Sequence, residues 1–386
     1  MKKHLLLTAI VLALVLSFSC GIFAADITSD KDNPNQYLIT EKLQNFTCTD
    51  DLWIGTLADW KAEGKTVGDT GTVFVNGEAI NDDDIIITNG KVGAVLAVGT
   101  RNPWGYPAGS ILDVGTVSEM KGGRDTVWSI EFLVNGWDSW APDNCGVVKF
   151  DVVKYDFKAK AEAATGLDAI KVSRIYNVGG NKFDVVTYYG IEKGAEVIMM
   201  FDQLTNTTGA DTSAVSNRFA MTNKGDDGGA MKGINNTTMI STYGNTEKNK
   251  YMTSYVLPGK NTSNKGIDHA WGRNGGSVGY MELRAGSGGK QAYVEGEVVT
   301  FDEYIIVSDE PTTKDTNDFL MNYYGTKKMA VSGTVKDAAG KAVSEPVIVV
   351  EKDGDSYGWY MGDKDGKFAF DLPAEEGFTA YVERDG

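Results

Sequence analysis

Apolar and polar residues alternate, or apolar residues form short blocks, along most of the chain after residue 26. The segment Ile170–Asn206 predicts three strands joined by two glycine-containing turns, and Glu297–Asp309 predicts a further strand. Apolar runs on both sides of an Asn-Gly pair predict hairpins, because both central residues of such a turn take positive φ. The sequence offers this signal at Asn76-Gly77 and Asn89-Gly90. The pattern therefore predicts a mainly β chain.

Two segments interrupt the alternation. Lys158–Gly166 is rich in alanine and predicts either two helical turns ending at a glycine or an irregular connection. Residues 310–327 have no alternation and predict a linker. Within the linker, Asn317–Tyr324 predicts a short helix capped by Thr316 or Asn317.

The linker divides the predicted strands into two domains. Residues 26–309 are expected to form a large β-sandwich or supersandwich of two broad sheets, and residues 328–386 a small β-sandwich. No repeat of fixed period is present.

The first 24 residues have the layout of a secretory signal peptide. A basic start precedes an uncharged apolar run, Leu5–Phe18, which is shorter than the ~20 residues that a transmembrane helix needs. Cleavage after Ala24 would release a protein that is secreted, extracellular or periplasmic. A lipid anchor at Cys20 is the alternative, disfavoured by Ser17 where lipoprotein signals usually carry leucine. No later segment is apolar and long enough to predict a membrane span.

Charge and histidine content exclude several classes of function. The 53 acidic and 37 basic residues give a net charge of −16, which argues against a nucleic-acid partner. After loss of His4 with the signal peptide, His269 is the remaining histidine, so multi-histidine zinc sites are excluded. We therefore expect no catalytic residues, no cofactor and no metal in this chain. Whether Cys48 and Cys145 pair in an oxidising compartment stays open.

The small domain resembles the carboxypeptidase regulatory-like family, whose members are transthyretin-like β-sandwiches appended to many secreted enzymes. The resemblance covers residues 330–386 and rests on Gly333, Val335, Asp337, Gly340, Pro346-Val347, Asp365-Gly366-Lys367-Phe368, Phe370, Leu372-Pro373 and Gly377. It implies a domain that continues for at least one more strand beyond Gly386. We therefore expect an incomplete domain in a longer protein.

The acidic stretch Gly362–Pro373 is also compatible at first sight with a calcium loop. An EF-hand register would place Met361 and Leu372 at positions that require carboxylates, and neither residue can ligate calcium. The family resemblance instead implies a hairpin with Gly366 in the turn and Phe368 and Phe370 in the core. Calcium in the other acidic turns, at residues 81–85 and 224–229, stays open.

The large domain is similar, more loosely, to the β-supersandwich regions that precede a regulatory-like domain in secreted metallohydrolases of the polymerase-and-histidinol-phosphatase type. The similar features are Ile87–Asp113, a meander ending near Gly209, and the segment 216–229. This resemblance implies that the chain is the non-catalytic front of a larger exported enzyme, acting in binding or scaffolding.

One loop, residues 135–144, predicts a binding site. Trp137 and Trp140 stand beside Asp138 and Asp143, as in sugar-binding surfaces where rings stack on pyranose faces and carboxylates bind hydroxyls. Packing of these tryptophans between the sheets is the competing interpretation. The expected partner is a glycan or cell-surface polymer.

Two alternative functions stay open: a carbohydrate-active enzyme that uses carboxylates such as Glu131, Asp138 and Asp143, or a surface adhesin. The sequence carries no indication of the oligomeric state.

Overall fold

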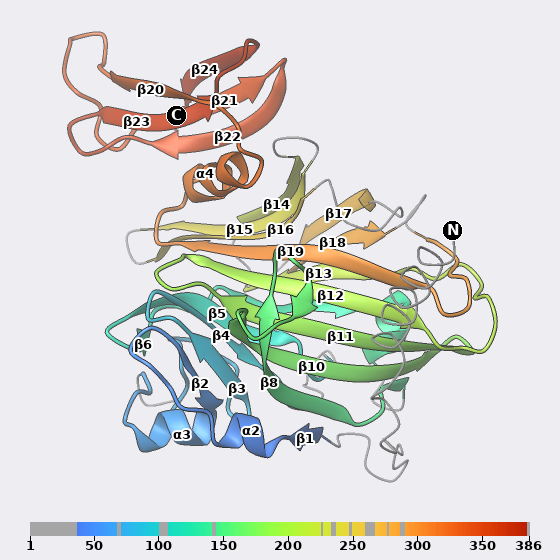
Figure 1. Ribbon diagram of the computed structural model, residues 1–386. Helices are drawn as coiled ribbons and strands as arrows, with labels where there is room; N and C mark the ends of the chain where they lie inside the picture. Colours follow the sequence, from blue (N-terminus) through green and yellow to red (C-terminus); the bar gives the residue numbers. More distant parts are fainter. Residues whose placement is uncertain are drawn as a thin grey trace, which may run out of the picture.

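Two large, facing β-sheets dominate the computed structural model of the chain (Figure 1). The structure describes residues 37–67, 71–99, 107–140, 144–224, 227–232, 237–246, 249–258, 267–275, 278–285 and 290–383. The predicted mainly β fold class is confirmed. None of the helices in this described part is long and apolar enough to cross a membrane.

The first large sheet has ten strands among the described residues. In spatial order they are β1 (Tyr37–Ile39), β8 (Val148–Asp156), β10 (Leu167–Val178), β11 (Asn181–Ile191), β12 (Val197–Asn206), β19 (Val298–Ser308), β16 (Asn249–Leu257), β15 (Thr238–Thr246) and β14 (Asp227–Lys232), with β9 (Ala161–Glu162) paired to β8.

The second large sheet has nine described strands. Their order is β17 (Ile267–Gly275), β18 (Val278–Ala285), β13 (Arg218–Asn223), β7 (Val127–Leu133), β5 (Ile111–Ser118), β4 (Val92–Leu96), β3 (Ile85–Thr88) and β2 (Trp53–Thr56), with β6 (Lys121–Gly122) paired to β5. Short helices α2 (Glu41–Gln44), α3 (Leu57–Ala62) and η1 (Gly136–Trp140) lie in the connections.

The meander predicted between residues 170 and 206 is confirmed as β10, β11 and β12, which pair antiparallel in sequence order. The turn between β10 and β11 has positive φ at both Gly179 and Gly180, which allows the tightest connection. The strand predicted at residues 297–309 is β19, and it pairs antiparallel with β12.

The two Asn-Gly pairs behave differently. Asn89-Gly90 joins β3 to β4 as predicted, but Gly90 alone of the pair has positive φ. The Asn89 carboxamide oxygen accepts from the Lys91 and Val92 N–H groups across the turn. The hairpin predicted at Asn76-Gly77 is wrong. There residues 71–84, which we call the strap, form no paired strands; Val75 bridges Arg124, and the N–H groups of Glu78 and Ala79 donate to Asp113 on β5.

The alanine-rich segment 158–166 forms turns and the short strand β9, so the irregular alternative is the correct one. Its Lys160 ammonium lies 2.6 Å from the Asp302 carboxylate and faces the Phe201 ring. Phe201 and Asp302 belong to β12 and β19, so these contacts hold the segment against the outer face of the ten-stranded sheet.

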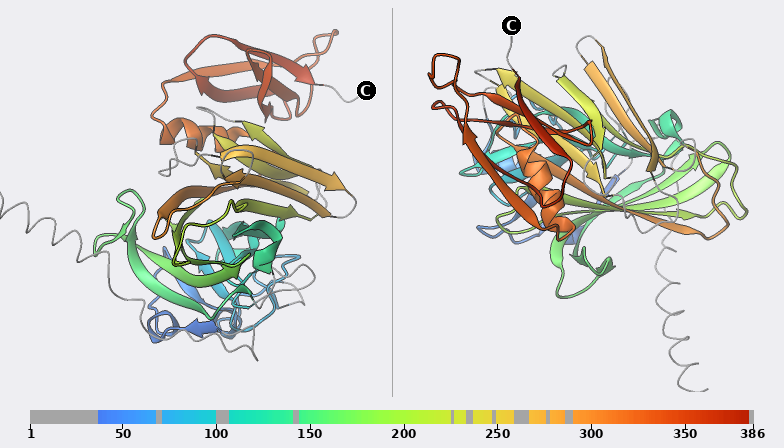
Figure 2. Two further views of the ribbon diagram at one scale, coloured as in Figure 1. Left: turned by 90° about the vertical axis from the view of Figure 1, so that its right-hand side faces the viewer. Right: turned by 90° about the horizontal axis from the view of Figure 1, so that it is seen from above.

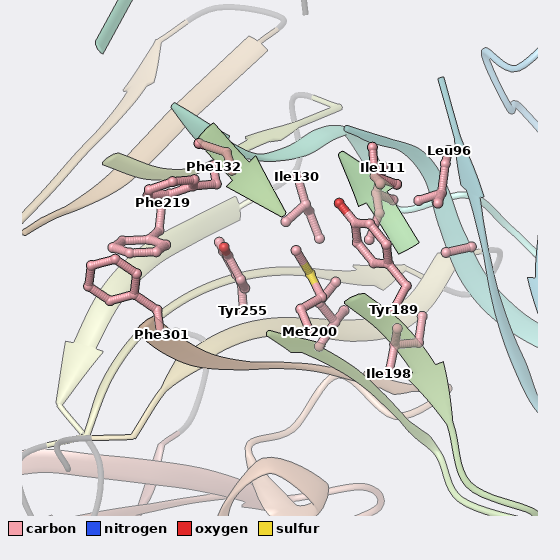
Figure 3. Packing of buried hydrophobic residues seen from close by; sticks show 14 of the residues in the cluster. Leu96, Ile111, Ile130, Phe132, Tyr189, Ile198, Met200, Phe219, Tyr255 and Phe301 are labelled. Carbon is pink, nitrogen blue, oxygen red and sulfur yellow. The ribbon is translucent and has the colours of Figure 1, made fainter. Parts of the chain in front are cut away.

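The main core lies between the two large sheets (Figure 3). Phe132 on β7 and Phe219 on β13 pack against Phe301 on β19, with ring centroids 5.8 and 4.8 Å from that of Phe301. Every second residue of these strands points inward, which matches the period of two in the sequence. Truncation of one such aromatic typically costs about 3–5 kcal/mol.

The outer face of the nine-stranded sheet, which points away from the ten-stranded sheet, is divided into two halves. Over β2 to β5 it is closed by α3 and the strap, which form a second apolar cluster around Trp53, Trp60 and Phe74. Thr56 begins α3 with a capping box that includes Asp59, and this turns Trp60 onto the sheet. The half over β7, β13 and β18 carries charged residues in place of this apolar packing.

The small C-terminal unit contains two small sheets. One pairs β20 (Lys328–Thr334) with β23 (Lys367–Pro373), and the other has the order β22 (Asp355–Met361), β21 (Val347–Lys352), β24 (Phe378–Glu383). Ile348, Val350, Tyr360, Phe370 and Leu372 form its core, with Phe368 packed against it.

The stretch Gly362–Pro373 forms a tight turn with Gly366 at positive φ, as predicted. The Asp363 carboxylate accepts from the N–H groups of Asp365 and Lys367. The predicted hairpin is wrong in one respect: the turn joins β22 to β23, which belong to different sheets, so the two strands do not pair with each other.

Helix α4 (Lys314–Tyr323) lies between the small sheets and the ten-stranded sheet, as Figure 1 and the left view of Figure 2 show. It begins three residues earlier than predicted, and its N-cap residue is Thr313. The predicted capping residues Thr316 and Asn317 are buried inside the helix. Their side chains bind outside it, Thr316 to the Ser254 hydroxyl and Asn317 to the Tyr360 hydroxyl.

Hydrogen bonds fix the small unit to the start of α4. The Thr313 hydroxyl donates to the Trp359 carbonyl and accepts from the Trp359 N–H, each at 3.0 Å. The Trp359 indole N–H donates to the Pro311 carbonyl at 2.7 Å, and its ring lies 5.2 Å from that of Tyr243. Residues 311–313 are buried, so we expect proteases to cut this linker slowly.

Gly358→Ala is expected to loosen this contact. A Cβ at Gly358 would lie 2.4 Å from Thr313 Oγ1 and 2.9 Å from Asn317 Nδ2, and overpacking of this kind costs about 1–3 kcal/mol. Hydrogen exchange of α4 should therefore accelerate. Gly146→Ala is the control, because a Cβ there meets nothing closer than 3.7 Å. Equal exchange rates in the two variants would contradict the prediction.

Candidate functional site

The charged half of the outer face is defined by four residues, which we call the polar face: Glu131, Arg218, Glu282 and Arg284. Glu131 is on β7, Arg218 on β13, and Glu282 and Arg284 are on β18. Their inward-pointing neighbours in sequence belong to the main core, which fixes the outward direction of the four side chains.

Register brings these residues together. Ala220 on β13 lies opposite Glu131 on one side and opposite Glu282 on the other. With strands about 4.8 Å apart, the Cα atoms of the two glutamates are about 10 Å apart. The small side chain of Ala220 lies between them, so no bulky group separates the two acids along this row.

Glu131 is a buried carboxyl group, 1% exposed. Neither of its oxygens has a hydrogen-bond partner among the described residues. Burial raises the pKa of Glu131 well above its ordinary value, and the nearby Ser129 hydroxyl opposes that rise. The raised pKa favours the neutral form of Glu131, and a protonated carboxyl group can donate a hydrogen bond.

Glu282 is shared by two arginines. Its Oε2 accepts from Arg218 Nη1 at 3.0 Å, and its Oε1 contacts the Arg284 guanidinium through both Nε and Nη2. The Glu282 side chain is fully buried, whereas that of Arg284 is 30% exposed. Charge-assisted contacts of this kind hold guanidinium groups in a fixed orientation.

The predicted binding loop begins beside the polar face. Asn135 and Gly136 both have positive φ, and a Cβ on Gly136 would lie 2.7 Å from the Arg218 guanidinium. Only glycine meets both requirements at this position. The loop is held to the start of β13, because the Asn135 N–H donates to Asn217 and the Ser216 N–H donates to Asn135.

The structure locates some of the predicted site residues. Trp137, Asp138 and Trp140 lie on η1, but the side chains of the two tryptophans lie outside what the structure describes, as does residue Asp143. The exposed Asp138 carboxylate accepts from the Asn135 side chain at 2.7 Å, and its carbonyl accepts from Asn144. These bonds hold the loop in shape.

Sequence reasoning named Glu131 but missed Arg218, Glu282 and Arg284. The available signal was Arg218 at the start of the segment "RFAMTN" and the alternate charges Glu282 and Arg284 within "YMELRA". Register also places His269 on β17 opposite Arg284, although the His269 side chain lies outside the described atoms. Cys48 and Cys145 are both free thiols, which answers the open question of their pairing in this structure.

A second charged cluster lies where the strap crosses the sheet, and we call it the strap cluster: Glu78, Asp113, Asp125 and Lys224. The Lys224 ammonium lies 2.5 Å from Asp125 Oδ2 and 2.6 Å from Glu78 Oε2. The Asp113 carboxylate accepts from the backbone N–H groups of Glu78 and Ala79. These bonds fasten the strap to β5.

Burial governs the ionisation of the strap cluster. It raises the pKa of Asp113 to about 7, against the backbone hydrogen bond from Glu78, and also raises that of Asp125. The pKa of Lys224 is lowered by burial but raised more by Asp125 and Glu78. Carboxylate oxygens of the three acids lie within 4.8 Å of one another, as ligands of a metal would, but the ammonium of Lys224 already supplies a positive charge there.

No protein-family model matches the chain, and no curated protein matches it in sequence. The solved structures described here are only distantly similar to this chain. A TPR-domain-containing protein from Parabacteroides distasonis is 12% identical over 59% of this chain and 47% of its own, with a TM-score of 0.38. The chain thus spans less than half of that protein.

Two further structures carry names from sugar chemistry. A putative aldose 1-epimerase from Klebsiella pneumoniae is 10% identical over 67% of this chain and 88% of its own (TM-score 0.34). A galactose mutarotase related enzyme from Lactobacillus acidophilus is 11% identical over 58% and 97% (TM-score 0.30). At such low scores these likenesses carry no argument about what this chain does.

Proposed function

We propose that this chain binds a glycan across the polar face and the adjoining loop 135–144. The observation that carries the proposal is the set of buried or half-buried ionisable side chains on one half of a sheet face whose other half is closed by apolar packing. Burying charged and polar groups costs free energy, so such a cluster is a candidate for function.

The chemistry of the polar face suits sugar hydroxyls. Arg284 presents a partly exposed guanidinium that can donate hydrogen bonds, and the exposed Asp138 carboxylate can accept them. Rings of Trp137 and Trp140 would supply the apolar contact that a pyranose face needs, as expected from the sequence.

The proposal is tested by measuring binding of the full chain to a glycan array, followed by the variants Trp137→Ala and Trp140→Ala. Each variant is expected to weaken binding at least about tenfold, because stacked aromatic rings supply much of the contact area. Tyr381→Ala is the matched control, since Tyr381 is an exposed aromatic on β24 of the small unit. Unchanged binding in both tryptophan variants, or no binding to any glycan, would refute the proposal.

A second candidate function is a carbohydrate-active enzyme, favoured by Glu131, a buried acid of raised pKa whose oxygens have no hydrogen-bond partner in the part of the chain that the structure describes. A carboxyl group of raised pKa is the form that a general acid requires at neutral pH. Release of reducing ends from bound glycans, abolished in Glu131→Gln with binding retained, would support this candidate. Binding without turnover would leave the chain as a binding region.

The wider setting is also part of the proposal. The basic and apolar start of the sequence supports export to a glycan-containing compartment. The small unit, with its two packed sheets and the residue pattern quoted above, supports membership of the carboxypeptidase regulatory-like family. Together these features support a role as the binding front of a larger exported enzyme, as the loose resemblance of the large domain implies.

A further inference from the structure

Three oxygen-bearing side chains lie together on the outer face of the nine-stranded sheet, over two of its middle strands. Ser129 and Glu131 are on β7, and Thr222 on β13 lies directly opposite Ser129. Their neighbours Ile130 and Met221 belong to the main core, so these three side chains point away from it. We call Ser129, Glu131 and Thr222 the oxygen cluster.

Strand geometry brings the oxygens of this cluster close to one another. Residues directly opposite each other on neighbouring strands have Cβ atoms about 4.5–5.5 Å apart, and alternate residues of one strand are about 7 Å apart. The longer Glu131 side chain spans that second distance, because its carboxyl group lies near the Ser129 hydroxyl, although neither group has a hydrogen bond of good geometry. The cluster therefore gathers its oxygens without joining them into a hydrogen-bonded network.

The oxygen cluster is buried and unsatisfied. Ser129, Glu131 and Thr222 are 0%, 1% and 3% exposed. Both hydroxyl oxygens and both Glu131 oxygens lack a hydrogen-bond partner in the part of the chain that the structure describes, and no basic side chain of that part forms an ion pair with Glu131. Folded proteins pair nearly all their buried polar atoms, so several unsatisfied oxygens in one place indicate a bound partner.

The composition of the cluster indicates which partner. Carboxylate and hydroxyl oxygens are the ligands that hard cations prefer, and the cluster offers no thiolate or imidazole for a softer metal. A buried carboxylate also needs a nearby positive charge. Glu131 supplies one negative charge, which a monovalent ion balances, whereas calcium sites usually combine several carboxylates.

We propose that the oxygen cluster binds one monovalent alkali cation, sodium or potassium, between Glu131, Ser129 and Thr222. The ion holds β7 to β13 from the outer side of the sheet and balances the buried carboxylate. A carboxylate that holds a cation cannot also act as a general acid, so this proposal and the enzyme candidate for Glu131 exclude each other. Glycan binding through Arg284 and the loop 135–144 does not depend on it.

The test compares the thermal stability of the full chain in sodium, potassium and choline chloride at equal ionic strength. Choline is too large for a closed site, and equal ionic strength keeps the screening of surface charges constant. An ion that binds only the folded state stabilises it by mass action. The Tm should therefore be at least about 2 °C higher in one of the alkali salts, and the increase should saturate as that ion replaces choline.

Variants then assign the ion to the oxygen cluster. Glu131→Gln removes the charge with little change of shape and should abolish the difference between alkali and choline salts. Glu41→Gln, at an exposed position on α2, is the charge-matched control and should keep it. Ser129→Ala and Thr222→Val each remove one ligand and should raise the alkali concentration at half effect several-fold. These two variants also provide the assignment if Glu131→Gln does not fold.

Two results would overturn the proposal. Equal Tm in all three salts would show that Glu131 holds a proton in place of an ion. A difference between the salts that persists in Glu131→Gln, or an unchanged half-effect concentration in both Ser129→Ala and Thr222→Val, would place the ion elsewhere. Glycan binding measured in choline chloride is unaffected by either result, so the two proposals fail independently.

Discussion

Lys224→Met is expected to destabilise the protein by about 3–5 kcal/mol at pH 8, the usual cost of removing one partner from a buried ion pair. The Lys224 side chain is 8% exposed, and its ammonium lies 2.5 Å from the fully buried Asp125 carboxylate. Methionine preserves the length of the side chain but leaves Asp125 and Asp113 without a cation. Urea denaturation of the full chain measures the effect.

The loss should be smaller at pH 5, because protonation can neutralise acids whose pKa burial has already raised. Lys154→Met is the control, since its partner Asp168 and Lys154 itself are solvent-accessible, and exposed pairs contribute about 0–1 kcal/mol. A Lys224→Met loss no greater than that of the control, or a loss independent of pH, would show that the strap cluster does not depend on this ammonium.

Stability is also expected to fall as pH rises from about 4 to about 7 and then to level off, through the contribution of Asp113. The carboxyl of Asp113 has a pKa of about 7 in the folded protein, raised by burial from its ordinary value of 3.8. In this window the folded state holds a proton that the unfolded chain has released, so rising pH favours unfolding. The full difference corresponds to about 4 kcal/mol.

Asp113→Asn should remove this part of the dependence, making the loss of stability between pH 5 and pH 8 smaller by about 2–3 kcal/mol. The asparagine keeps a carbonyl oxygen that can accept from the Glu78 and Ala79 N–H groups. Asp365→Asn, in the exposed turn between β22 and β23, is the charge-matched control. Stability that increases with pH through this window would show that Asp113 is ionised in the folded protein.

Strands and their simplest turns were predictable because their signals are local. The glycines at 179 and 180 and the alternation in residues 170–206 define a meander without reference to anything outside it. The hairpin prediction at Asn76-Gly77 failed because tertiary contacts determine the conformation of the strap. The strap backbone binds Asp113, which is far away in sequence. The start of α4 failed for the same reason, since Thr313 binds Trp359 across the contact with the small unit.

The candidate site was predictable only in part. Glu131 and the loop 135–144 lie close together in the sequence. Their acidic and aromatic residues are types that commonly bind sugars, so they could be proposed from the sequence. Arg218 and Glu282 are 64 residues apart, and their contact depends on β13 pairing with β18, which no local pattern specifies. Long-range strand order is therefore the information that the sequence alone did not supply.

The contact at Trp359 determines where the chain can be divided. Since the Trp359 indole donates to the Pro311 carbonyl and Thr313 binds the Trp359 backbone, α4 and the residues before it complete the small unit. The apolar side of α4 around Leu320 belongs equally to the ten-stranded sheet. A fragment that starts at Lys328 would lose these hydrogen bonds and also the bond from Asn317 to the Tyr360 hydroxyl, so separate expression of the small unit should begin no later than Pro311.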